Sequence, residues 1–161
     1  ACYDVILDKN GCLADYKVIG ENDEAKGTKW YAYLKIHAPS PWYNNQTYLD
    51  TLNKKAVSRF VEVTHDKYKE KVGYGFGETV PAIFTDEPQF TRKQVLNNST
   101  DTDKDIAMPW TDDFPDTYKA QYGDDILESL PELFWELPDG EVSKTRYHFH
   151  IQNVLATSLQ Y

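Results

Sequence analysis

The chain has 161 residues, of which 40% are hydrophobic and 27% charged, a composition that suits one soluble domain with a buried core. The net charge of −9 argues against nucleic-acid binding, which relies on Lys and Arg to neutralise phosphate. No apolar run approaches the roughly 18 residues that a membrane span needs. A neutral or cationic ligand suits this balance better, although acidity mostly reports on solubility.

A β-hairpin is predicted over residues 3–19, where apolar residues alternate with polar ones and Asn10-Gly11 supplies a two-residue turn. In this register Cys2 and Cys12 do not face each other, so no disulfide is expected between them. No disulfide framework and no basic-then-apolar leader are visible, which favours a cytoplasmic location.

A parallel α/β pattern follows the hairpin. Short apolar strands are predicted at Trp30–Ile36 and Thr79–Phe84, separated by a helix that Asn53 caps and that runs to Gly73. Strand, helix, strand is typical of parallel α/β folds. A further helix is predicted to begin at Asp112 or Asp113, to run to Tyr122 and to end at Gly123, and other helical segments are predicted at 126–134 and 142–159.

The fold class expected from this order is α/β: part of a (β/α)8 TIM-type barrel with an N-terminal β-hairpin. Residues 1–29 form the hairpin and a charged loop, and residues 30–161 form a partial barrel segment. A complete barrel needs about 250 residues and eight strands, so two strands represent only a portion of one. Apolar faces are then expected to remain exposed and to make the chain prone to associate.

Adjacent carboxylates end the second predicted strand, in Ile83-Phe84-Thr85-Asp86-Glu87-Pro88. Active sites of parallel α/β proteins lie at the carboxyl ends of their strands. Because neighbouring strand residues point to opposite sides, one acid is expected to reach the barrel mouth. We expect Glu87 to be the reacting group and Asp86 to orient it. The alternative is a strand end with two solvated acids.

Glycosidic bonds are cleaved by two carboxyl groups, so a second acid is needed. Asp50 is the candidate, because its loop follows the preceding strand; the alternative is an acid that caps the helix after it. Sugar sites combine stacking surfaces with hydrogen-bonding groups, and aromatic residues make up 14% of the chain. The substrate-binding candidates are therefore Trp42, Tyr43, Asn44, Asn45 and Trp110.

Two weaker signals lie later in the chain. Asp112 follows Trp110 and either lines the site or caps the next helix. His148 and His150 stand two apart, which would place both on one face of a strand as metal ligands. The segment favours a helix, in which they diverge, and no metal site is assigned.

The segments NNQTYLDTLNKKAVSRFVEVTHDKYKEKVG, VPAIFTDEPQF, PWTDDFPDTYKAQYGDDILESLPELFW and TRYHF resemble large bacterial glycoside hydrolases. They look like the barrel of α-L-rhamnosidase-type enzymes, glycoside hydrolase family 106, over roughly residues 30–149. The resemblance implies a (β/α)8 barrel flanked by β-sandwich domains, a carboxylate-rich and sometimes calcium-assisted site, and catalytic roles for Glu87 and Asp86. The last eleven residues depart from the family pattern.

Three functions remain open on the sequence. The first is a glycoside hydrolase segment acting on an oligosaccharide or glycoside, with no required cofactor and with further domains in a longer chain. The second is a carbohydrate-binding module without catalysis. The third is a metal-dependent hydrolase that uses Asp86, Glu87, His148 and His150.

Overall fold

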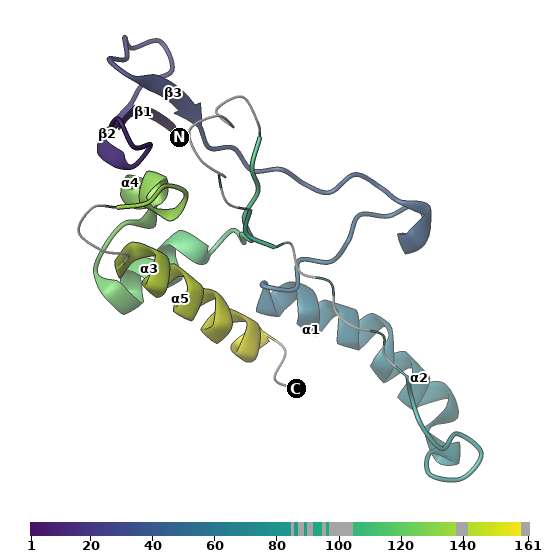
Figure 1. Ribbon diagram of the computed structural model, residues 1–161. Coiled ribbons are helices and arrows are strands. Elements are labelled where there is room, and N and C mark those ends of the chain that lie inside the picture. Colours follow the sequence, from purple (N-terminus) through teal and green to yellow (C-terminus); the bar gives the residue numbers. More distant parts are fainter. Residues whose placement is uncertain are drawn as a thin grey trace.

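The computed structural model describes residues 1–84, 86, 89, 92–94, 96, 105–137 and 142–158. In these ranges a small antiparallel sheet lies next to a cluster of helices, which together form the main body of the molecule. A long segment of the chain extends away from this body and returns to it (Figure 1). The strands are β1 (Cys2–Leu7), β2 (Leu13–Ile19) and β3 (Thr28–Tyr31). The helices are α1 (Lys54–Val63), α2 (His65–Val72), α3 (Phe114–Tyr122), α4 (Ile126–Ser129) and α5 (Val142–Ser158), with short 3-10 turns η1 (Pro41–Tyr43), η2 (Gly73–Gly75) and η3 (Leu130–Leu133).

The predicted hairpin is confirmed. β1 pairs with β2, and Cys2 stands opposite Ile19, so both cysteines remain free thiols. The connection is a three-residue loop, Lys9–Gly11, rather than the predicted two-residue turn. Gly11 adopts a φ of 81°, in the left-handed region that a third loop position of this kind requires.

The first of the two predicted barrel strands is shorter than expected and pairs differently. β3 ends at Tyr31, which stands opposite Cys2 in an antiparallel pair with β1. Beyond this pair, Ala32 and Ala1 exchange two further bonds, from the Ala32 N–H to the Ala1 carbonyl at 2.8 Å and from the Ala1 nitrogen to the Ala32 carbonyl at 2.9 Å. Leu34 and Ile36, predicted inside that strand, lie beyond its end and are exposed.

The second predicted strand, Thr79–Phe84, is wrong as a strand. Val80 makes an isolated parallel bridge with Phe76, and residues 81–84 have no regular structure. Pro81 has no N–H to donate to a ladder, and the described residues provide no neighbouring strand for it. Phe84 is 88% exposed. The described strands form one antiparallel sheet in the order β2-β1-β3. They include no parallel barrel strand, so the (β/α)8 barrel stays a prediction.

The helix predictions are confirmed, with two refinements. Asn53 caps α1 through its side-chain oxygen, which accepts the N–H groups of Lys55 and Ala56. The predicted single helix divides at Thr64, whose hydroxyl donates back to the Phe60 carbonyl at 2.6 Å. Asp113, rather than Asp112, precedes α3, and it makes no side-chain capping bond.

The core joins the start of the chain to its last third. Tyr3, Val5 and Leu13 of the sheet pack with the side chains of the C-terminal helices, around a fully buried Phe114. The rings of Trp30 and Trp135 meet edge to face at 4.7 Å. Residues from both predicted segments, 1–29 and 30–161, thus share one core.

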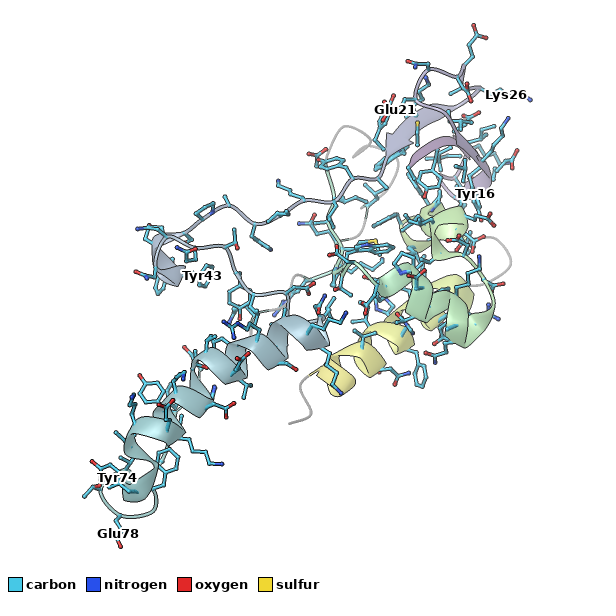
Figure 2. All side chains as sticks on the ribbon, turned by 180° about the vertical axis from the view of Figure 1, so that it is seen from behind. Tyr16, Glu21, Lys26, Tyr43, Tyr74 and Glu78 are labelled. Carbon is cyan, nitrogen blue, oxygen red and sulfur yellow. The ribbon has the colours of Figure 1, made fainter. Side chains whose placement is uncertain are left out.

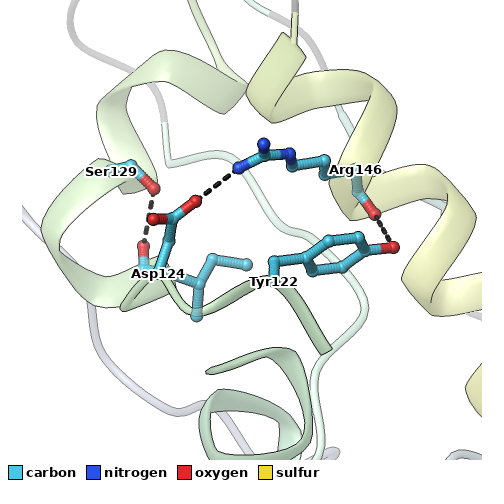
Figure 3. A network of polar contacts seen from close by, with 5 residues as sticks. Tyr122, Asp124, Ser129 and Arg146 are labelled. Carbon is cyan, nitrogen blue, oxygen red and sulfur yellow. Dashed lines mark hydrogen bonds and ion pairs between the residues drawn. The ribbon is translucent and has the colours of Figure 1, made fainter. Parts of the chain in front are cut away.

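Polar bonds fix the helices around that core. Arg146 of α5 forms an ion pair with Asp124, and its guanidinium lies 5.6 Å from the centre of the Tyr122 ring (Figure 3). The Tyr122 hydroxyl donates to the Arg146 carbonyl, so both the backbone and the side chain of Arg146 are bonded to residues 122–124.

The helices α1 and α2, with η2, extend away from this body as an arm (residues 54–75). Figure 2 shows Tyr74 and Glu78 at its far tip, remote from Tyr16 in the sheet. α1 contacts α5 near its start, whereas the contacts of α2 run to α1 and η2. Val57 is the buried side chain of α1, and α2 buries none.

His150 supplies a pH prediction. Its ring is buried among Phe114, Tyr118 and Tyr122, with Nε2 bonded to the Thr117 hydroxyl and Nδ1 to Gln121. Burial lowers the pKa of His150, and the nearby Asp113 offsets this only in part. A depressed folded-state pKa means that the unfolded chain binds the proton first as the pH falls.

We expect the free energy of unfolding to fall as the pH drops below about 6.5, the unperturbed histidine pKa. Urea unfolding at pH 7.5 and at pH 5 measures this loss. His150→Gln, which keeps a hydrogen-bonding side chain and removes the titration, should show a smaller loss. Equal losses in the two proteins would contradict the assignment.

Candidate functional site

The loop that holds the predicted sugar contacts is closed by its own backbone. Ser40 pairs with Gln46, and the Ser40 hydroxyl accepts the N–H of Trp42 at the start of η1. Asn44 and Asn45 have φ values of 54° and 58°, in the left-handed region that Asn tolerates better than most residues. The sequence Asn44-Asn45 therefore forms the reversal that presents Trp42.

The aromatic side chains of this loop lie in different environments. Trp42 is 90% exposed, so its indole face is open to solvent. The ring of Tyr43 is paired with that of Tyr48, at 4.7 Å between ring centres. Asn44 and Asn45 are also exposed. Trp42 and the two asparagines are therefore accessible to a ligand, whereas Tyr43 packs against Tyr48 within the loop.

The structure brings the loop into contact with the chain just after the acid pair. The backbone N–H of Gln89 donates to the Tyr48 hydroxyl at 2.7 Å. Asp86 is exposed, and Glu87 lies outside the described residues. The loop that contains Tyr48 thus contacts Gln89, and within the described residues no parallel strand leads to Asp86.

Asp50 uses both carboxylate oxygens within the protein. Oδ1 accepts the N–H of Leu52 at 3.0 Å, and Oδ2 accepts the hydroxyl of Thr111 at 2.6 Å. Thr111 is buried, with 2% of its surface exposed. These bonds give Asp50 a structural role, because they fix the turn before α1 and tie that turn to residue 111. Asn53, three residues later, is the cap of α1.

Trp110 is anchored by the core. Its ring lies 5.0 Å from that of Phe114, and the carbonyl of the preceding Pro109 accepts the hydroxyl of Tyr147 at 2.8 Å. With Thr111 bonded to Asp50, the Pro109–Thr111 segment is fixed at each residue. Trp110 is half-buried, so part of its surface remains available at this junction.

Neither the histidine pair nor any carboxylate group builds a metal centre in the described ranges. His148 and His150 lie on α5, where His150 is committed to Thr117 and Gln121. Burial lowers the pKa of His148, with a smaller contribution from Lys93. No group of three or more His, Cys, Asp or Glu side chains within those ranges is placed to hold a metal ion.

No known family model, curated protein or solved structure matches this chain. The resemblance to α-L-rhamnosidase-type enzymes therefore stays a prediction that rests on the sequence motifs alone. Among the described residues, no helix is both long enough and apolar enough to cross a membrane.

Sequence reasoning missed the hydroxyl groups that assemble this region. Tyr48, Thr111 and Tyr147 each contribute one long-range bond, to Gln89, Asp50 and Pro109 respectively. A hydroxyl partner many residues away leaves no spacing signal. The only available indication was the position of Thr111 next to the predicted contact Trp110.

The Asp50–Thr111 bond can be tested by a double-mutant cycle. Asp50→Ala leaves the buried Thr111 hydroxyl without its partner, which typically costs about 1–3 kcal/mol of unfolding free energy. Thr111→Val should cost a similar amount. The double variant should lose less than the sum, by roughly 0.5–3 kcal/mol, because the two side chains act on one bond. Strict additivity in urea unfolding would show that the side chains do not interact.

The Tyr48–Gln89 contact can be tested by amide exchange. Tyr48→Phe removes the acceptor and keeps the ring pair, so exchange of the Gln89 amide should quicken roughly 3- to 10-fold, the equivalent of about 1 kcal/mol. Tyr43→Phe is the matched control, since it preserves the ring pair and leaves the Tyr48 hydroxyl in place. A quickening of the same size in both variants would place the protection elsewhere.

Proposed function

We propose that this chain is part of a glycoside hydrolase, and that it cleaves the glycosidic bond of an oligosaccharide or glycoside with Glu87 as the reacting carboxyl group and Asp86 as its orienting neighbour. The observation that carries the proposal is the bond between Tyr48 and Gln89. It joins an aromatic and amide-rich loop to Gln89, which follows Glu87 by two residues in the sequence.

The chemistry requires that combination. A sugar ring presents C–H faces to an aromatic surface and hydroxyl groups to amides. Trp42 offers such a surface, and Asn44 and Asn45 offer amide donors and acceptors beside it. A carboxylic acid at the scissile oxygen then protonates the leaving group, and a second carboxylate acts as base or nucleophile.

Asp50 fits the second carboxylate role less well than the sequence suggested. Both of its oxygens accept bonds from the protein, so it would have to release Thr111 or Leu52 to reach a substrate. We therefore assign Asp50 to positioning of the loop. Asp86, which is exposed, keeps its role as the orienting neighbour of Glu87, and the second carboxylate would come from another part of the enzyme.

A carbohydrate-binding module is the second candidate, and the exposure of Trp42 favours it. An indole that is 90% exposed on a closed loop can bind a glycan without any catalysis. The acid pair would then be a solvated part of the surface. The two functions differ in what Glu87 does, and that difference can be measured.

Glu87→Gln removes the transferable proton and keeps the shape of the side chain. If Glu87 is the general acid, hydrolysis of an alkyl glycoside should fall about 10²- to 10⁴-fold. A nitrophenyl glycoside, whose leaving group needs no proton, should lose much less. The matched control is Glu78→Gln, an exposed glutamate at the far tip of the arm (Figure 2), which should keep full activity.

Other outcomes assign Glu87 differently. Equal losses on the two substrates would make it a nucleophile or base. Glycan binding that Glu87→Gln leaves intact, with no hydrolysis by the wild-type protein, would favour the binding module. Trp42→Ala should weaken glycan binding under either function.

A further inference from the structure

The arm (residues 54–75) has an apolar stripe that its own chain covers only in part. Phe60, Val61, Thr64, Tyr68 and Val72 follow the buried Val57 at helical spacing. Phe60 is 41% exposed and Tyr68 is 65% exposed. Short helices draw most of their stability from packing of such a face, and α2 has eight residues, none of them buried. A stable α2 therefore requires a surface that covers this stripe.

The solvent-accessible surface of the chain is large enough to include a protein interface that covers the stripe. It measures 11753 Å², whereas a compact protein of 18.6 kDa exposes about 8,200 Å². The difference is about 3,500 Å². An obligate homodimer buries roughly 1,000–2,500 Å² on each partner, so the excess leaves room for an interface of that class.

Charge indicates where the arm docks. Residues 54–75 carry six lysines and arginines against three acids, a net charge of +3 in a chain of −9. Residues 112–136, which contain α3, α4 and η3, carry eight acids against Lys119, a net charge of −7. The exposed acids there are Asp112, Asp113, Asp116, Asp124, Glu128 and Glu136, of which Asp124 is paired with Arg146.

The arm does not reach this acidic face within one molecule. α2 extends away from α3 and α4 in both views of the ribbon (Figures 1 and 2). A second copy can place its arm there, and a two-fold axis makes the exchange reciprocal, so that each arm meets the partner's acidic face. We propose that the chain forms a homodimer in which the α1–α2 arm of each copy packs its apolar stripe on the α3–α4 face of the other.

The test uses two variants of the whole chain with opposite charge changes. Lys54→Glu with Lys69→Glu and Lys71→Glu changes the net charge of the arm from +3 to −3. Asp113→Lys with Asp116→Lys, Glu128→Lys and Glu136→Lys changes that of the face from −7 to +1. Each protein alone should dimerise at least tenfold more weakly than wild type in sedimentation, because like charges then meet across the interface. An equimolar mixture should dimerise again, since the acidic arm meets the basic face and the unchanged arm meets the unchanged face.

Three results would overturn the proposal. The first is a wild-type chain that remains monomeric up to about 100 μM protein at low salt, well above the dissociation constants typical of a specific interface. The second is a dimer that both variants leave intact, or a mixture that stays monomeric, which would place the interface elsewhere. The third is a monomer that binds a DNA duplex through the arm, which would identify an anionic partner instead. Tyr68→Ser, which keeps every charge, should also weaken the dimer, and an unchanged dimer would contradict the role of the stripe.

Discussion

The packing of the N-terminal sheet against the C-terminal helices is the contact on which the rest of the structure depends. Tyr3 and Leu13 meet Phe114, Leu133 and Tyr147 in one core, although more than a hundred residues separate these segments. Bonds at the same seam, from Tyr16 to Glu132 and from Leu13 to Glu136, fix the register of the two layers. Closing so long a loop costs entropy, which this buried aromatic contact must offset. The intervening residues are therefore held mainly where they leave the body and where they return to it.

Because the core depends on contacts between distant segments, only features that form within a few residues could be predicted reliably from the sequence. The cap at Asn53, the stop at Gly123 and the turn at Gly11 act within a few residues, and their chemistry can be recognised in isolation. A strand has no such independence, because it needs a partner that sequence does not specify. Trp30–Ile36 and Thr79–Phe84 have the composition of strands, yet only the start of the first has a continuous partner.

The candidate site shows the same division. Composition pointed to Trp42, Asn44 and Asn45, and their exposure agrees with a role in binding, which remains a proposal. Strand order predicted that the loop lies near the acid pair, whereas the contact that the structure describes joins Tyr48 of the loop to Gln89. The sequence could not separate the two uses of Asp50, because a catalytic acid and a turn-forming acid have the same side chain. Its bonds to Leu52 and Thr111 make that distinction.

The exposed aromatic residues fall into two groups that suit different partners. Trp42 stands on a tight loop between polar neighbours, so it offers one flat face within a hydrogen-bonding rim, which suits a sugar ring. Phe60 and Tyr68 stand about two helical turns apart, on a stripe that also includes Val61 and Val72 and has lysines beside it. A stripe of that kind matches an extended protein surface, because its contact area exceeds what one small ligand can cover. The proposed glycan recognition and the proposed self-association thus involve separate surfaces, so a change in one surface need not disturb the other.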